Sequence, residues 1–569
     1  MGRLRNLIVS LVYACVLSLA GCNCGAHHDA PDDDAAGDDG GLDPHEGVGG
    51  DDASAGAAGR DGASGEGGTD AQPPEDAGRD AGPAPMMIPT SGSQAVLLVG
   101  LSDDSGPQRV IALDLASSET HVLAVSEDLS FGHASPDGTA VLFGGNERSR
   151  EDNFFIVRLL DGGVVTAAAV TGVDGDVGDR QLLGWSYDSR FVLLSRTSVV
   201  GEHGIDLIDV HSGARRWSAE GDVTSMKSAR FAPRGHWFSY ALTGPRGSSG
   251  IARVTASGID DIEVPQFIGE GSYSQDGSRI AYTLQAGTGV QTYYRDLAPD
   301  ADANEIRVDE VPDATGFYPV AFSGEEHLLV QVLTGAGPTE LRRVELATFQ
   351  SEEIALPEMS HVLAHTTSVS SLLGVQPDNA AGEDTLLLVD PLGEHDAVPI
   401  ETIVRDPPST PLIGPLQLGA AGPDHFFYTY NFATLTFVAR AGDGSAAVSV
   451  VSLEDELGFG CLPQPAETTR GSERLALTTG PSSEALLMVD LSQAMAQRVA
   501  RYDAPHGGAV LCPVWNAARD SFAFVEVVGG ETVDRAYLYK VDWPAAGSPE
   551  EPELVFEAED SLSLLAYRP

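Results

Sequence analysis

Positively charged residues are scarce in this sequence of 569 residues. Lysine and arginine together number 33, against 84 aspartates and glutamates, and the formal net charge is -51 at pH 7. The only lysines are Lys227 and Lys540, a bias that is typical of GC-rich coding. Because proteins that bind nucleic acid neutralise its phosphates with clustered cations, this composition predicts no nucleic-acid partner.

The apolar run near the N-terminus is too short to indicate a membrane span. It extends over Leu7–Leu19 and follows Arg3 and Arg5, which matches the charged and apolar regions of a secretory signal. The run ends in Leu-Ala-Gly directly before Cys22. Small residues at this place fit cleavage by a signal peptidase, so the pattern predicts export.

The Leu-Ala-Gly-Cys segment resembles the lipobox of bacterial lipoproteins. That resemblance implies that residues 1–21 are a signal peptide and that Cys22 becomes the lipidated N-terminus. Two or more acyl chains anchor a protein stably at a bilayer. The implied location is the bacterial cell envelope, at the outer rather than the inner membrane, with the lipid bilayer as one partner. The alternative is an ordinary secretory signal in which Cys22 and Cys24 have no such role.

Large apolar residues are almost missing between residues 22 and 91. Residues 25–90 contain 16 acidic residues and two arginines, a net charge of -14. Such a stretch cannot bury enough apolar surface to fold, and its charges repel one another, so we predict a disordered linker. Random-coil scaling for about 66 residues gives a root-mean-square reach of roughly 45 Å. The linker would therefore hold a folded domain away from the lipid surface.

Residues 92–569 contain a repeated unit of an apolar strand, a polar turn and a second apolar strand. The clearest turn is Ser135-Pro-Asp-Gly138, before Ala140-Val-Leu-Phe143. Turn-forming residues between two β-patterned runs predict a hairpin. Further copies lie around residues 186, 232, 274, 323 and 515, and the first five turns are 51, 46, 42 and 49 residues apart. This period is typical of β-propeller blades.

A second repeated feature is a short apolar strand that ends in an acidic residue, as in Val110–Asp114. The other clear copies end at Asp209, Asp296, Glu345, Asp390, Asp490 and Asp542. Three weaker copies begin at Phe154, Ile251 and Leu435. The resulting ten repeats of about 48 residues predict an all-β fold, a single large propeller of four-stranded blades. Ten exceeds the usual four to eight blades, so seven or eight blades with insertions, or two smaller propellers, remain alternatives.

The two ends of this region predict how the ring closes. Ala95–Val99 has the pattern of a second strand without a first, and Ser561–Ala566 has the pattern of a first strand without a second. Pairing them would complete one blade from both ends of the chain and remove two open sheet edges.

The strand, SPDG turn and strand pattern resembles the TolB-like repeats of bacterial envelope propellers. It is more distantly similar to the propeller domains of prolyl-oligopeptidase-type enzymes. The resemblance implies a blade but not a function, because the turn aspartates cap the backbone. The nearest approach to a nucleophile elbow, Gly184-Trp-Ser186-Tyr-Asp188, lacks the final glycine, so we expect no hydrolase domain like that of the oligopeptidases.

Cys461 and Cys512 lie about one repeat apart, each in the predicted first strand of its blade. Equivalent positions in adjacent blades can meet, and disulfides persist in exported proteins, so the spacing predicts a bond between them. The alternative is two buried thiols that do not come within bonding distance.

Asp174, Asp176 and Asp179 alternate with small residues in a predicted loop. Carboxylates on a flexible backbone suit calcium, although the loop departs from the EF-hand pattern and a solvated acidic turn is the alternative. His361 and His365 lie in a β-patterned run, where a spacing of four residues separates them by about 13 Å, too far to share a metal. We expect no catalytic residue set and no other cofactor.

Two function classes remain. The first is a non-enzymatic envelope lipoprotein whose propeller binds or scaffolds a protein, a glycan or an envelope component. The alternative is a propeller enzyme of hydrolase, lyase or oxidoreductase type with its site at the mouth of the central channel. A propeller can host either, so the fold does not decide between them.

Overall fold

The computed structural model describes strands and turns between Met87 and Arg568. The largest gaps in this range are residues 102–107, 146–153, 170–176, 307–313, 405–415, 441–447, 455–472 and 545–550. All described residues belong to one compact unit of the chain, which contains Ala84–Pro569. Every regular element in this part of the chain is a β-strand. A search of the described residues finds no helix that is long and apolar enough to cross a membrane.

The described strands form ten antiparallel sheets, which we call blades 1 to 10. The strands of each blade are given in order across the sheet, from the first strand at one edge to the outer strand at the other edge. Blade 1 consists of β41 (Ser561–Arg568), β2 (Ala95–Leu101), β3 (Gln108–Asp114) and β4 (Thr120–Ser126). Blade 2 consists of β5 (Leu129–Ala134), β6 (Ala140–Gly145), β7 (Phe154–Leu160), β8 (Gly163–Ala169) and β1 (Met87–Pro89). Blade 3 consists of β9 (Val177–Trp185), β10 (Phe191–Ser198), β11 (His203–Asp209) and β12 (Arg215–Gly221).

The next four blades have four strands each. Blades 4 to 7 consist of β13 (Lys227–Phe231), β14 (Trp237–Leu242), β15 (Ser249–Val254) and β16 (Ile259–Glu263); β17 (Phe267–Tyr273), β18 (Arg279–Ala286), β19 (Gly289–Asp296) and β20 (Ala303–Ile306); β21 (Ala314–Ser323), β22 (His327–Thr334), β23 (Gly337–Glu345) and β24 (Ser351–Ile354); and β25 (His361–His365), β26 (Leu372–Asp378), β27 (Glu383–Val389) and β28 (Val398–Val404).

Two of the last three blades depart from four regular strands. Blades 8 to 10 consist of β29 (Leu416–Ala421), β30 (His425–Tyr430), β31 (Leu435–Arg440) and β32 (Val448–Glu454); β33 (Arg474–Thr479), β34 (Ala485–Asp490) and β35 (Gln497–Asp503); and β36 (Ala509–Val510) with β37 (Val514–Trp515), β38 (Ser521–Val528), β39 (Arg535–Asp542) and β40 (Glu553–Ala558). In blade 9 the described strands number three.

The burial pattern shows why the strands read as apolar runs rather than as alternating ones. All residues of β14 are buried, because both faces of an inner strand pack on neighbouring blades. The outer strand β16 of the same blade has exposed residues at three of its five positions. Inner strands are therefore the apolar part of each repeat, and outer strands carry its polar part.

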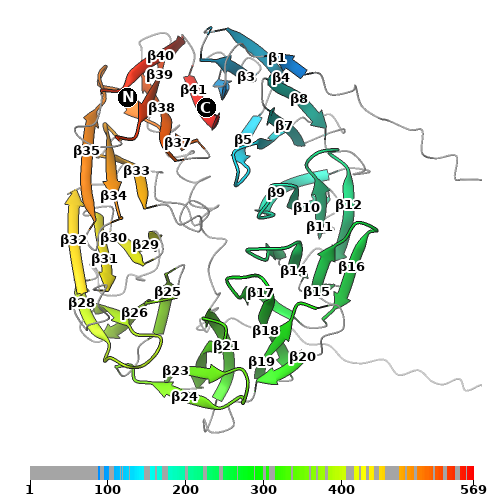
Figure 1. The fold of residues 1–569 in the computed structure, drawn as a ribbon, viewed down its shortest axis with the longest axis vertical. Coiled ribbons are helices and arrows are strands. Elements are labelled where there is room, and N and C mark those ends of the chain that lie inside the picture. Colours follow the sequence, from blue (N-terminus) through cyan, green and yellow to red (C-terminus); the bar gives the residue numbers. More distant parts are fainter. Residues whose placement is uncertain are drawn as a thin grey trace, which may run out of the picture. The chain divides into compact units, whose positions relative to one another are not determined.

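Among the described residues, apolar clusters join nine of the ten pairs of neighbouring blades. Phe191 and Leu207 of blade 3 pack with Phe238 of blade 4, and similar clusters join blades 2 and 3 and every pair from blades 4 and 5 to blades 9 and 10. Leu113 of blade 1 packs with Val525 of blade 10. The sheets of blades 1 and 2 also touch, through β41 and β5. The blades thus form a closed ring in sequence order (Figure 1).

The ring closes as the two ends of the sequence predict. β41 pairs antiparallel with β2, with Leu97 opposite Ala566, so the C-terminal strand is the first strand of the blade that the N-terminal strands complete. The prediction of one large propeller with about ten repeats is confirmed. The ten described sheets exclude seven or eight blades with insertions. Two separate propellers would require a break in the contacts between successive blades, and the described residues show each blade in contact with the next.

Two features depart from the regular pattern. Met87–Pro89 lies inside the range 22–91 that composition predicts as a linker, yet it forms β1 and pairs antiparallel with β8 as a fifth strand of blade 2. The folded unit therefore reaches further toward the N-terminus than its composition indicates. In blade 10, β36 and β37 both pair with β38, so the first strand is interrupted around Cys512 and Pro513. Proline cannot donate a ladder hydrogen bond, which accounts for the interruption.

Candidate functional site

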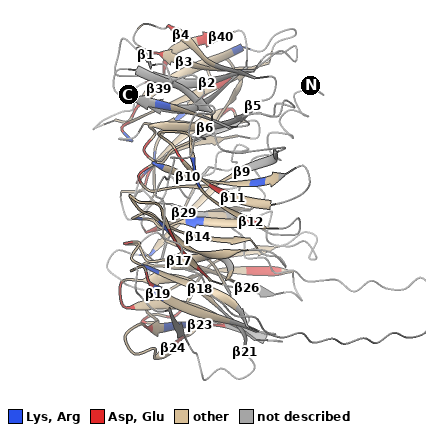
Figure 2. Ribbon diagram, turned by 90° about the vertical axis from the view of Figure 1, so that its right-hand side faces the viewer, with Lys and Arg blue, Asp and Glu red and all other residues tan. Residues whose placement is uncertain are grey.

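Seen from the side, the strands run from one face of the ring to the other, so each blade has hairpin turns on both faces (Figure 2). The turns between first and second strands bond to one another from blade to blade, and we call the face on which they lie the turn face. In blade 5, the Ser274 hydroxyl donates to Asp276 at 2.6 Å and accepts the backbone N–H of Arg279 at 3.0 Å. Blades 2 and 3 repeat both bonds with Ser135 and Asp137 and with Ser186 and Asp188. This repeated bonding shows that the turn serines and aspartates hold the hairpins together.

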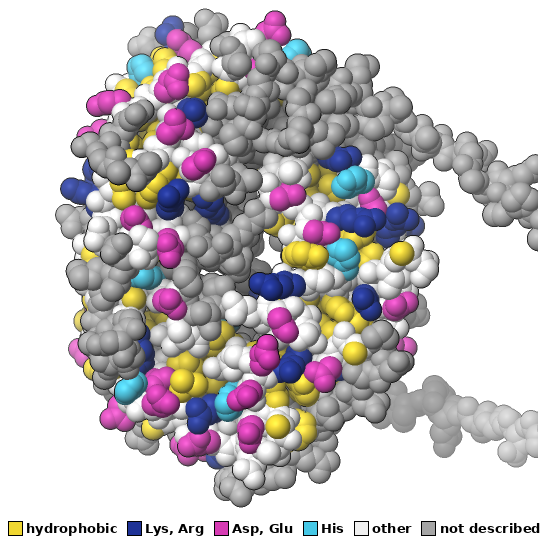
Figure 3. All heavy atoms as spheres, viewed as in Figure 1, with side chains coloured by type: hydrophobic (Ala, Val, Ile, Leu, Met, Phe, Trp, Pro, Cys, Tyr) yellow, Lys and Arg dark blue, Asp and Glu magenta, His cyan; other side chains and the backbone are white. Residues whose placement is uncertain are grey.

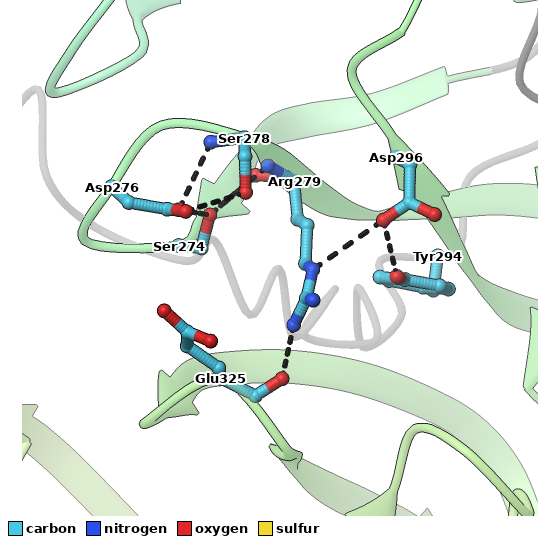
Figure 4. Close-up of polar contacts among 7 residues, drawn as sticks. All are labelled: Ser274, Asp276, Ser278, Arg279, Tyr294, Asp296 and Glu325. Carbon is cyan, nitrogen blue, oxygen red and sulfur yellow. Dashed lines mark hydrogen bonds and ion pairs between the residues drawn. The ribbon is translucent and has the colours of Figure 1, made fainter.

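The blade 5 turn shows the electrostatics of these aspartates (Figure 4). Asp276 also accepts the backbone N–H of Ser278 at 3.0 Å and its hydroxyl at 2.7 Å. Burial would raise the pKa of Asp276, but the donors of Ser274 and Ser278 outweigh it and hold the pKa at about 2. The carboxylate is therefore ionised at neutral pH and saturated with local donors.

Further bonds connect the turn face from blade to blade. Arg279 pairs with Asp296 of its own blade at 3.4 Å and donates to the backbone carbonyl of Glu325 in blade 6 (Figure 4). Equivalent links join neighbouring blades elsewhere: Asp137 N–H to Ser189, His236 to Asp188, Arg343 to the carbonyl of Leu392, Ser370 to Asp424, and Arg474 to the carbonyl of Arg519. The polar groups of this face therefore contribute to the rigidity of the ring.

Ser186, Asp188 and His236 contain the residue types of a hydrolase triad in the wrong order. The Ser186 hydroxyl donates to one oxygen of Asp188 at 2.8 Å, and the His236 Nε2 contacts the other oxygen at 2.8 Å. A triad requires the imidazole to accept the serine proton, whereas here the carboxylate lies between the two. Burial would raise the pKa of Asp188, but the His236 and Ser186 bonds lower it. The cluster is an inter-blade link.

On the face seen in Figure 3, acidic and basic side chains are interspersed rather than gathered by sign. The described residues thus show no single-sign surface on this face, although the chain as a whole is strongly acidic.

Most of the sequence-predicted site residues fall outside the described part of the chain. Cys22, Asp174 and Asp176 are among them, and Asp179 lies in β9 with a side chain that is not described. Where side chains are described, no group of three or more His, Cys, Asp or Glu residues could hold a metal ion. The lipidation and calcium sites stay predictions.

Cys512 lies in the interruption between β36 and β37 and forms a disulfide. Its predicted partner Cys461 falls within residues 455–472, outside the described residues. The pairing of these two cysteines stays a prediction.

His365 belongs to β25, the first strand of blade 7, and its neighbour His361 has a side chain that is not described. The His365 Nδ1 lies 3.0 Å from the carbonyl of Thr366, to which it must donate, because a carbonyl only accepts. Burial lowers the pKa of His365, and together with the positive charge of Arg230 it outweighs the Thr366 hydrogen bond, which raises that pKa. His365 is therefore a neutral imidazole, in keeping with a structural role.

The described residue cluster that sequence reasoning missed lies in blade 10. Glu526 of β38 is fully buried, and its Oε1 accepts the backbone N–H groups of His506 and Gly508, each at 2.9 Å. Its Oε2 lies 3.1 Å from the His506 Nδ1 and 3.4 Å from the Tyr539 hydroxyl, whose oxygen also lies 3.1 Å from Nδ1. Because a carboxylate only accepts, both Nδ1–H and the Tyr539 hydroxyl can donate to Oε2. A Cβ at Gly508 would lie 2.4 Å from the carbonyl oxygen of Val527, so this close approach requires glycine.

The cluster fixes the imidazole of His506 in a partly exposed position. The His506 ring stacks on Tyr537, with 3.8 Å between ring centroids, and its side chain is 39% exposed. Burial and the charge of Glu526 raise the pKa of Tyr539, which therefore remains a protonated donor. With Nδ1–H directed at a carboxylate, Nε2 is the nitrogen that can exchange protons, which is how a carboxylate orients a general base. No hydrogen bond to Nε2 is found among the described residues.

One signal in the sequence points to this cluster. Glu526 is an acidic residue inside the otherwise apolar strand Phe522–Val528. A buried carboxylate must find donors, but the sequence does not show that one lies twenty residues earlier.

Comparison with known proteins gives only distant likenesses. No protein-family model matches the sequence, and no curated protein matches it. Among solved structures, a eukaryotic initiation factor is 12% identical, with 84% of this chain and 98% of that chain covered and a TM-score of 0.41. TolB from Acinetobacter baumannii is 11% identical, with 55% and 80% covered and a TM-score of 0.26.

Prolyl oligopeptidase B from Galerina marginata is 13% identical, with 64% of this chain covered and a TM-score of 0.37. This chain spans about half the length of that enzyme, 54%. TolB proteins are thus among the similar solved structures, as the SPDG turns suggest, but likenesses of this size carry no argument about function. The fold assignment rests on the order and closure of the sheets.

Proposed function

We propose that this protein is a lipid-anchored envelope protein whose β-propeller binds or scaffolds a protein, a glycan or another envelope component without catalysing a reaction. The observation that carries the proposal is where the chain joins the ring. β1 pairs with β8, the fourth strand of blade 2, so the folded unit is entered at its rim. The described part of the chain therefore begins at the rim, and the closed ring is the surface that the proposal assigns to binding.

The rigidity of the ring supports a binding role. Closure by β2 and β41 removes two sheet edges, and the turn-face links fix neighbouring blades to one another. A preformed surface loses less conformational entropy when it binds than a flexible one, so more of the contact energy appears as affinity. The loops and the rim can then differ in chemistry while the frame stays fixed.

The anchored location rests on the sequence. The Leu-Ala-Gly-Cys22 segment supports lipidation, and the acidic composition of residues 25–90 supports an extended spacer. In this account the lipid holds the protein at the bacterial envelope, the linker sets its distance from the bilayer, and the propeller makes the specific contact.

Capture from detergent-solubilised envelopes tests this function. Residues 22–91 and residues 84–569 are immobilised separately, because ring closure is contained within the second fragment. The account predicts that the propeller fragment recovers a defined partner and the linker fragment does not. Recovery by the linker fragment alone would reject a binding propeller. In parallel, a clickable palmitate analogue should label the full chain and should not label Cys22→Ala.

The blade 10 cluster favours one second candidate, a propeller enzyme that uses His506 as a general base. Its support is the fixed orientation of the imidazole by a fully buried Glu526. A panel of chromogenic ester, peptide and glycoside substrates tests it, with His506→Gln as the variant and Arg498→Gln, on the outer strand β35, as the matched control. Turnover that His506→Gln removes and the control retains would support the enzyme. Absence of turnover with every substrate class would reject it for those reactions.

A further inference from the structure

One outer edge of the ring is already covered by an added strand. In the described sheets, one outer strand ends each blade at the rim, and an edge strand that lacks a partner is a template for strand addition. In blade 2, β1 adds to this edge, with Ile88 opposite Val164 and Met87 opposite Val165. The strand that receives it, β8, reads Gly-Val-Val-Thr-Ala-Ala-Ala and contains no charged residue. An outer edge of this ring can therefore accept an extended segment.

Most other outer strands carry the residues that prevent strand addition. Charged side chains and proline on an edge strand disfavour pairing with another chain. Such residues are Arg215 and Arg216 in β12, Asp260 and Asp261 in β16, Glu305 in β20, Glu352 and Glu353 in β24, Pro399 and Glu401 in β28, Arg498 and Arg501 in β35, and Glu553 and Glu557 in β40.

The outer strand of blade 8 lacks this protection. β32 reads Val-Ser-Val-Val-Ser-Leu before its final residue, Glu454, and in the described sheet it is paired on one side only, by β31. Val450 of this strand is 46% exposed. β28, the outer strand of the preceding blade, contacts β32 and leaves Val404 61% exposed. β28 and β32 follow one another along the rim (Figure 1).

A second outer strand, β4 of blade 1, also lacks these residues over most of its length, but it differs in its surroundings. Its Val122 is 52% exposed, but β4 contacts β8, the strand that β1 already covers. The edge at β32 combines a strand whose first six residues are uncharged with a second exposed valine from the neighbouring blade. The β32 edge is therefore the more favourable of the two for the addition of a strand.

We propose that the edge of β32, with Val450 and Val404, is a docking site for an extended segment of a partner protein that adds to blade 8 as a strand. The proposal rests on the proposed binding function and names its surface. Backbone hydrogen bonds supply the pairing, and β-branched side chains at alternate positions pack on the two valines. Because residues 91–569 carry a net charge of -39, a segment with basic flanks is favoured over a second copy of this acidic chain.

A synthetic peptide tests the site on the full-length protein. The probe is fluorescein-labelled Lys-Thr-Val-Thr-Val-Thr-Lys, and its binding is followed by fluorescence anisotropy. The proposal predicts saturable binding that Val450→Lys weakens by about tenfold or more, because a lysine on an edge strand opposes pairing. Val450→Thr, which keeps the β-branched shape, should retain binding, and Val122→Lys on β4 is the matched control that should leave binding unchanged.

Three outcomes would overturn the proposal. The first is no saturable binding to the full-length protein, and the second is a loss of binding in Val122→Lys that equals or exceeds the loss in Val450→Lys. The third is a dimer in sedimentation velocity that Val450→Lys dissociates, since the edge would then hold a second copy. Capture of an envelope partner by residues 84–569 that persists in Val450→Lys would leave the binding function standing and remove this edge from it.

Discussion

Two carboxylates of this propeller, Asp276 in the blade 5 turn and Glu526 in blade 10, both accept several hydrogen bonds. The donors come from neighbouring residues in one case and from distant residues in the other. The donors of Asp276 lie two residues away on either side, within a surface turn. Glu526 is fully buried and is held by a loop twenty residues earlier and by a neighbouring strand. The local arrangement repeats from blade to blade and only stabilises. The long-range arrangement occurs in blade 10 and also fixes an imidazole at the surface.

The largest effect is expected where the carboxylate is buried. Glu526→Ala should lower the free energy of unfolding by about 3–5 kcal/mol, because it leaves two backbone N–H groups and two side-chain donors without their acceptor. Urea unfolding followed by far-UV circular dichroism measures it. Glu526→Gln keeps one acceptor oxygen and should lose less. Equal stability of Glu526→Ala and the unmodified protein would show that the cluster is not formed.

His506→Ala removes one side-chain donor of Glu526 and tests how much that donor contributes to stability. The change removes the ring that stacks on Tyr537 and the Nδ1–H donor, but the backbone N–H bonds to Glu526 remain. We expect a loss of about 1–2 kcal/mol in the same unfolding measurement. A loss as large as that of Glu526→Ala would mean that the imidazole, and not the backbone, satisfies the buried carboxylate.

The surface turn should respond less and should depend on pH. Asp276→Ala is expected to cost about 1 kcal/mol at pH 7, the typical net value of a partly exposed hydrogen-bonded group. Because the pKa of Asp276 is held at about 2, below its ordinary value of 3.8, its contribution is complete above about pH 4 and is lost as the pH falls through about 2.

Unfolding of the two proteins at several pH values checks this sign. The stability difference between Asp276→Ala and the unmodified protein should shrink between about pH 4 and about pH 2. A difference that grows as the pH falls would contradict the assigned donors.

The smallest effect is expected at an inter-blade link. His236 and Asp188 are both about a quarter to a third exposed, at 27% and 30%, so His236→Ala should cost less than about 1 kcal/mol. The readout is the unfolding midpoint at low and at high salt. A loss of several kcal/mol would mean that a single link, and not the closed ring, holds these blades together.

The same contrast explains what the sequence could predict. Turns such as Ser135–Gly138, and the closing strands at Ala95 and Ser561, are recognisable because their signals lie within a few residues and repeat at a fixed period. β1 was missed because three residues at the end of an acidic stretch carry too little pattern. Its strand forms only through pairing with β8, more than seventy residues later.

The blade 10 cluster was missed for a related reason. An acidic residue within an apolar strand indicates a buried charge, but its partners depend on how the loop at His506 meets β38 and β39. The predicted lipidation, calcium and disulfide sites depend on residues 22, 174, 176 and 461, which lie outside the described part of the chain. Those three sites therefore stay predictions.

The central claim is that the propeller, and not the linker, contacts the partner. Hydrogen–deuterium exchange of the full-length protein, alone and in complex with the captured envelope partner, tests it most directly. The account predicts slower exchange within residues 87–568 on binding, with the amides of residues 22–83 exchanging as fast as before. Slowing confined to residues 22–83 would contradict it.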